Sequence, residues 1–348
     1  MKTAEVLTQR LRLVYRWYEG MVNPDTGMFE YLYLPQTDAF VREKSPIRDI
    51  ASVWDAELLG DFLGTRELGP LVRKSLAHYD GYLLDRDGYM ILDSRRLQEP
   101  SSIAHSAFMA LALLCAPPPI STRQISALAE GILRQQRRDG SYKVYFHDMP
   151  DTGEELYAGE AMLALMEAYR QLPEARYLQS VERGFSFYNT QYYARDRVSE
   201  NALVFFGNWQ SQACRRLFEC ARSPALKQQV MDYVCRIHDQ IADQGFYESV
   251  ERRPGELFSV EAACALEGLN EAYALACASH DDRAQRYRRC ICSGLTYLLG
   301  LQCTDDGSGR ERGGFGMSRN DRAQRIDVTG HAASAFIKSI ENGIDCQW

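Results

Sequence analysis

Apolar residues recur along most of the chain at the spacing of an amphipathic α-helix, whereas the two-residue alternation of a β-strand is scarce. Between the helical segments comes a repeated turn that contains glycine, usually with an aromatic residue close behind it. The turn occurs at 23–29, 85–89, 136–142, 240–246 and 302–308, and a sixth copy that lacks the glycine falls at 191–197. Because glycine readily adopts a positive φ, we expect each turn to stop one helix while the aromatic side chain packs back onto it.

The helices that follow these turns share one polar position. Segments 155–165 (E-L-Y-A-G-E-A-M-L-A-L) and 256–266 (E-L-F-S-V-E-A-A-C-A-L) align without gaps, which matches Glu160 with Glu261. The other segments place Asp55, Ser106, Gln210 and His331 at this position. Every residue at this position is polar, although the other residues of these helices are mostly small and apolar. The repeat therefore also relates the candidate functional residues to one another.

The repeat also predicts the architecture. A helical hairpin of about fifty residues cannot bury its apolar faces alone, so successive hairpins must stack. Six hairpins that close on themselves form an all-α (α/α)6 toroid, with outer helices that end at the glycine turns and Ala-rich inner helices around the axis. We therefore predict a single toroid domain over residues 1–348.

Several short motifs resemble the α/α toroid superfamily. They are turns of the type Q-x-x-D-G-S, as at 136–141, the G-G-F-G stretch at 313–316, and the D-V-T-x-H-A run at 327–332. That superfamily includes six-hairpin glycosidases, sugar epimerases, uronate-processing enzymes, terpenoid cyclases and prenyltransferases. The resemblance covers nearly the whole chain, but it implies an architecture and leaves the reaction open.

The charge balance argues against a nucleic-acid partner. The net charge is −7, and the basic residues lie in helical stretches that also carry acids. The first twenty residues interleave Arg and Glu with apolar positions, which is not typical of a signal peptide. No stretch is long enough to span a bilayer. We therefore expect a cytoplasmic protein without a membrane partner.

The ten cysteines do not form a recognisable disulfide framework. Five of them lie within amphipathic helical patterns, where cysteine acts as a small hydrophobe: Cys214, Cys220, Cys235, Cys264 and Cys277. We interpret the cysteines as reduced thiols. Cys290 and Cys292 are too close in sequence for a usual zinc knuckle. We therefore expect neither a metal nor another cofactor.

In toroids of this kind the inner helices point their N-termini at one open mouth, so the resemblance implies a ring of polar side chains there. The candidate catalytic residues are Asp55, Glu160, Glu261, Asp327 and His331. The candidate ligand-binding residues are Trp54, His105, Tyr157, Trp209, Gln210, Glu256 and Arg325. Carboxylates, imidazole and aromatic rings suit a sugar or oligosaccharide. We therefore favour a carbohydrate-active enzyme: a hydrolase, a lyase or an epimerase.

Structural explanations compete with each assignment. Acids in a first helical turn are stabilised by the macrodipole by ~0.3–1 kcal/mol. His105 suits a core position as well as a functional one, and Trp54 and Trp209 are of a type that lies more often in a core than in a binding site. Asp327 and His331 lie on one side of a helix, so the carboxylate could orient the imidazole. Two other functions stay open: a toroid that binds a ligand or partner without turnover, and an enzyme similar to prenyltransferases or terpenoid cyclases. A prenyltransferase-like zinc site would need a third ligand, which Glu261 could supply.

Overall fold

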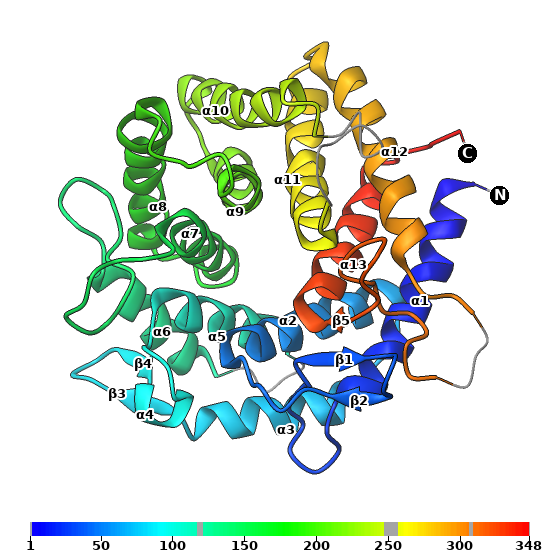
Figure 1. Cartoon of the computed structure of the whole chain (residues 1–348). Helices are drawn as coiled ribbons and strands as arrows, with labels where there is room; N and C mark the ends of the chain where they lie inside the picture. The colour runs from blue at the N-terminus through cyan, green and yellow to red at the C-terminus, as the bar shows by residue number, and fades with distance from the viewer. Residues whose placement is uncertain (1, 117–120, 247–256, 306–308, 348) are drawn as a thin grey trace. The chain divides into compact units, whose positions relative to one another are not determined.

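The computed structural model describes residues 2–116, 121–246, 257–305 and 309–347 and is predominantly helical (Figure 1). Twelve of the helices in these ranges are long, and α4 is a single turn. They are α1 (Thr3–Met21), α2 (Pro46–Leu63), α3 (Gly69–Asp80), α4 (Ser94–Leu97), α5 (Ile103–Cys115), α6 (Thr122–Arg134), α7 (Glu154–Gln171), α8 (Ala175–Phe187), α9 (Leu203–Cys220), α10 (Pro224–Asp243), α11 (Ser259–Ala278), α12 (Arg283–Leu301) and α13 (Ile326–Glu341).

Five short strands complete the described structure. Strand β1 (Leu32–Leu34) pairs antiparallel with β2 (Ala39–Phe40) on one side and with β5 (Gln324–Arg325) on the other. Strands β3 (Leu83–Asp85) and β4 (Met90–Leu92) form a separate hairpin. In the first sheet, β5 leads directly into α13, the helix that carries the candidate residues Asp327 and His331.

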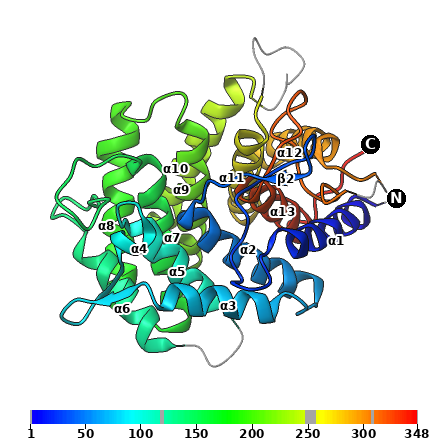
Figure 2. The same ribbon diagram turned by 60° about the horizontal axis from the view of Figure 1, so that its bottom comes forward.

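The chain divides into two compact units, residues 1–75 with 238–348 and residues 76–237. In the first unit α11 packs against α13, and α13 packs against α2, with α1 and α12 beside them. In the second unit α5 packs against α7 and α7 against α9, with α6 and α8 beside them. The two views agree that α11 and α13 lie side by side (Figures 1 and 2). The prediction of a single domain stays a prediction.

The repeated turns have the predicted backbone. Gly27, Gly88, Gly140 and Gly245 all have positive φ, from 70° to 98°. In the copy that lacks glycine, Asp196 takes the left-handed conformation instead, with φ 52°. The turn at 85–89 corrects one detail, because it joins β3 to β4 and does not stop a helix directly. Gly307 lies outside the described residues.

Small residues allow the inner helices to approach closely, as predicted for Ala-rich segments. Helix α5 is buried over nearly its whole length. In α7, a Cβ added at Gly159 would lie 2.6 Å from the Cβ of Trp209 in α9. Since real side-chain atoms do not approach so closely, glycine is required for this contact.

The interpretation of all cysteines as reduced thiols was wrong for one pair. Cys292 in α12 forms a disulfide with Cys346, which lies after α13. The two residues are 54 positions apart, so sequence spacing gave no indication of the pairing. The five cysteines assigned to helical patterns lie outside this disulfide and keep their thiols, as expected.

Candidate active site

The first unit gathers charged side chains at the N-terminal end of α13. Strand β5 and the start of α13 bring Arg325 next to Asp327, whose carboxylate accepts hydrogen bonds from Arg325 Nε at 2.5 Å and Nη2 at 2.9 Å. Arg48, in the first turn of α2, donates a further bond from Nε at 2.9 Å. Burial alone would raise the pKa of Asp327, but the two guanidinium groups lower it below its usual value. Asp327 is therefore an ionised, firmly held carboxylate.

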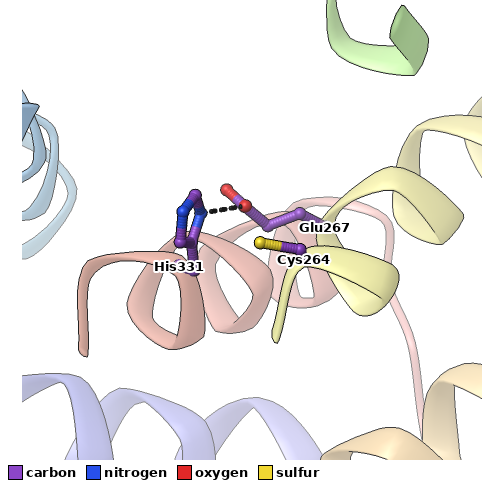
Figure 3. Close-up of side chains that lie close together, drawn as sticks. All are labelled: Cys264, Glu267 and His331. Carbon is purple, nitrogen blue, oxygen red and sulfur yellow. Dashed lines mark hydrogen bonds and ion pairs between the residues drawn. The ribbon is translucent and has the colours of Figure 1, made fainter. Parts of the chain in front are cut away.

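One helical turn further along α13, His331 meets Glu267 of α11. Its Nδ1 lies 2.6 Å from Glu267 Oε2, and Figure 3 shows the imidazole directed at this carboxylate. The Glu267 side chain is only 4% exposed, whereas that of His331 is 18% exposed. Burial by itself would lower the pKa of His331, but neighbouring Cys264 and Glu267 raise it well above its ordinary value. The pair is a carboxylate-oriented imidazole with a partly open face.

Cys264 completes this cluster. It lies three residues before Glu267 on the same face of α11, and the Figure 3 close-up shows its thiol beside the imidazole. The potential ligand atoms of Cys264, Glu267 and His331 all lie within 4.8 Å of one another. Burial is the largest cause that raises the pKa of the Cys264 thiol, and the neighbouring His331 opposes this shift.

Asp55 reaches the cluster from α2. A Cβ added at Gly330 of α13 would collide with its carboxylate, so the two helices touch at this point. Burial raises the pKa of Asp55 to about 7, the charge of His331 opposes this shift, and Glu267 and Asp327 reinforce it. Asp55 thus changes its protonation near neutral pH, unlike Asp327.

Within this unit the structure brings Asp55, Asp327 and His331 close together, and the catalytic roles predicted for them stay predictions. Arg325, a predicted ligand-binding residue, is a hydrogen-bond partner of Asp327, and its role in ligand binding stays a prediction. Glu160, Gln210 and Ser106 belong to the other unit, so one mouth shared by all six positions stays a prediction.

Three other candidates, Glu261, His105 and Trp209, make contacts that fit the structural alternatives, and their roles in catalysis or ligand binding stay predictions. Glu261 Oε2 accepts a bond from the backbone N–H of Phe258 at 3.4 Å, as an acid at a helix start does. His105 Nε2 lies 2.8 Å from Glu99 Oε1, and its Nδ1 lies 2.8 Å from Ser102 Oγ. Trp209 is 5% exposed and packs edge-to-face on Phe108, with ring centroids 5.6 Å apart.

The remaining candidates differ in burial, and one of them lies outside the described residues. The Gln210 side chain is fully buried and accepts a bond from Tyr233 Oη at 3.2 Å. Glu160 is buried, whereas Trp54 and Tyr157 are partly exposed. Glu256 lies outside the described residues. For all of these residues a role in ligand binding or catalysis stays a prediction.

Glu267 and Cys264 were absent from the predicted site. Glu267 lies six residues beyond the repeated position, and the alignment of helix starts directed attention to Glu261 instead. The sequence nevertheless contained one indication. Glu267 lies deep inside an apolar helix, beyond the first turn where the macrodipole stabilises an acid. The sequence also suggested no cysteine suitably spaced from His331, although Cys264 lies beside it in space.

Comparisons with known proteins show the fold. No protein-family model matches the sequence, and no curated protein was found to match it. A sugar epimerase from a ruminal bacterium aligns with a TM-score of 0.70 and 15% identity, covering 99% of this chain and 100% of that chain. A D-mannose isomerase aligns at 0.72 and 10%, covering 97% of each chain. An unsaturated glucuronyl hydrolase specific for heparin aligns at 0.68 and 10%, covering 99% and 100%.

These similarities confirm the all-α, α/α toroid fold predicted from the repeat. The membrane prediction was tested separately. Within the part of the chain that the structure describes, every helix is too short or too polar to cross a bilayer.

Proposed function

We propose that this protein is a carbohydrate-active enzyme that moves a proton at the carbon next to the carbonyl group of an open-chain sugar, as an epimerase or isomerase. The observation that carries the proposal is the 2.6 Å contact between His331 and buried Glu267. A neighbouring carboxylate fixes the orientation of an imidazole and stabilises its protonated form, which suits it to general acid–base catalysis. The sugar epimerase and sugar isomerase among the structural neighbours support this reaction class.

The distribution of carboxylates favours proton transfer over glycoside hydrolysis. Hydrolysis requires two available carboxyl groups on opposite sides of a glycosidic bond. In the described cluster, Glu267 is bonded to His331 and Asp327 is bonded to two arginines. Asp55 is therefore the carboxyl group that neither an arginine nor the imidazole holds through a hydrogen bond in this cluster.

The proposed roles follow from these contacts. Asp55, whose pKa of about 7 leaves much of it ionised at neutral pH, takes the proton from the carbon next to the sugar carbonyl, while protonated His331 gives a proton to the carbonyl oxygen, which leaves an enediol. Return of a proton to the same carbon from the other face gives the epimer, and its addition to the former carbonyl carbon gives the isomer. Glu267 positions the imidazole, and Arg48 and Arg325 hold Asp327 near the sugar hydroxyl groups.

Hydrolysis is the second candidate because Asp55 and Asp327 have pKa values that are shifted in opposite directions. Such a split is what an acid and a base in one site require. The glucuronyl hydrolase among the structural neighbours supports the same alternative.

The deciding experiment offers the protein reducing mono- and disaccharides together with their methyl glycosides, and follows the products by NMR. Proton transfer requires a free carbonyl, so epimer or isomer should form from the reducing sugars and nothing from the methyl glycosides. Cleavage of a glycosidic bond would instead establish hydrolysis. Binding without any turnover would indicate a ligand-binding toroid.

A further inference from the structure

We propose that Cys264, Glu267 and His331 form a three-ligand site for a thiophilic divalent cation, with Zn²⁺ as the expected ion. The three side chains offer one sulfur, one oxygen and one nitrogen atom, all within 4.8 Å of one another. Ligands of a tetrahedral zinc ion lie about 2.0–2.3 Å from the metal. Small side-chain rotations would therefore bring these atoms to bonding distance.

The donor set selects the cation. Thiolate and imidazole ligands favour zinc and similar transition metals, whereas Mg²⁺ and Ca²⁺ require mostly oxygen ligands. Three protein ligands leave the fourth tetrahedral position open to water or another small ligand. The site thus has the composition of an open zinc site, whereas a structural site would have four protein ligands.

The scaffold holds the ligands in place before a cation arrives. Cys264 and Glu267 lie on one face of α11, and His331 lies on α13, which packs directly against α11. Cys264 is 1% exposed, and Glu267 is 3% exposed. Asp55 and Asp327 interact electrostatically with His331 and add negative charge around the site. A cation would offset the cost of burying these acids together.

The cation and the proposed reaction compete for the same atoms. A metal ion on His331 would replace the proton shared with Glu267, so the metal-loaded enzyme should not transfer protons. This consequence rests on the proposed function, whereas cation binding does not. Proton transfer and metal binding can therefore be tested independently.

The test uses Co²⁺ as a spectroscopic substitute for Zn²⁺ on protein first treated with a chelator. We expect one Co²⁺ per chain, with the near-ultraviolet absorption of a thiolate–cobalt bond, and displacement by Zn²⁺. Loss of an outer-shell partner weakens metal binding by up to about 100-fold. Because Cys264 would bind the metal directly, Cys264→Ala should abolish that absorption and weaken Zn²⁺ binding by more than this factor. Cys214→Ala is the matched control, since Cys214 is equally buried in α9 but lies outside the cluster.

His331→Asn provides a second variant if Cys264→Ala does not fold, and it should weaken binding to a similar extent. Absence of Co²⁺ binding by the wild type, or retention of the thiolate absorption in Cys264→Ala, would overturn the metal site. Loss of the absorption in Cys214→Ala would do the same. Deuterium exchange into a sugar, measured on the chelator-treated protein, reports on the proposed function alone.

Discussion

Gly330 lets the Asp55 carboxylate lie against the backbone of α13. A methyl group at this position would collide with that carboxylate and would lie 3.0 Å from the hydroxyl oxygen of Tyr18. We predict that Gly330→Ala lowers the free energy of unfolding by about 1–3 kcal/mol, because overpacking displaces buried groups. Urea denaturation measures this change.

Gly20→Ala is the control for Gly330→Ala. Gly20 also lies in a helix, but a Cβ there meets no atom within 4 Å. Its replacement should stabilise the protein by about 1 kcal/mol through helix propensity. Equal effects of the two substitutions would show that the contact between Asp55 and Gly330 has been misplaced.

The pH dependence of the unfolding free energy tests the protonation state of His238. It is fully buried in α10, and burial lowers its pKa to about 3, although Glu271 opposes the shift. Glu271 is itself paired with Lys338 of α13. As pH falls below 6.5, the unfolded chain gains a proton on this histidine that the folded chain does not, so stability falls by about 1.4 kcal/mol per pH unit.

His238→Gln should reduce that loss between pH 7 and pH 5, whatever its effect at pH 7. The comparison requires urea denaturation of both proteins at each pH. If the wild type and the variant lose the same stability over this interval, His238 is not held neutral in the folded protein.

In the turns that connect the elements, substitutions at Gly140 and Gly88 distinguish the energetic cost of backbone strain from that of steric overlap. Both have φ above 90°, but a Cβ at Gly140 would collide with the carbonyl oxygen of Arg183, whereas at Gly88 it meets no atom within 4 Å. Gly88→Ala should cost about 1 kcal/mol for the left-handed backbone alone. Gly140→Ala should cost more, by about 1–3 kcal/mol. Thermal unfolding checks the order, and a reversed order would contradict it.

The turns and helices were predictable because they repeat. Glycine, aromatic and apolar positions follow local rules, so six imperfect copies support one another. In the proposed site, the repeated position of the helices led to Asp55 and His331, and Asp327 lies one helical turn before His331. Glu267 and Cys264 depend on how α11 turns toward α13, which is set by packing between segments more than sixty residues apart in sequence. No local pattern contains that information.

The Cys292–Cys346 disulfide contributes to the stability of the whole chain. It ties the segment after α13 to α12, and the backbone N–H of Cys346 also donates to Thr3 Oγ1 of α1 at 2.8 Å. Closing a loop of this length restricts the unfolded chain, so Cys292→Ser/Cys346→Ser should lower the unfolding free energy by about 2–4 kcal/mol. Cys303→Ser, which removes a free thiol, is the control. An unchanged denaturation midpoint in the double variant would show that the bond does not form in solution.

The central claim is that His331, oriented by Glu267, moves a proton on a sugar. The most direct measurement is the rate at which deuterium from D₂O enters the carbon next to the carbonyl of a reducing sugar, followed by NMR. The wild type should catalyse this exchange, and His331→Asn, with an unchanged melting temperature, should be slower by about 100-fold or more, as expected for loss of a general acid. Exchange at the wild-type rate in folded His331→Asn would show that His331 does not take part in proton transfer.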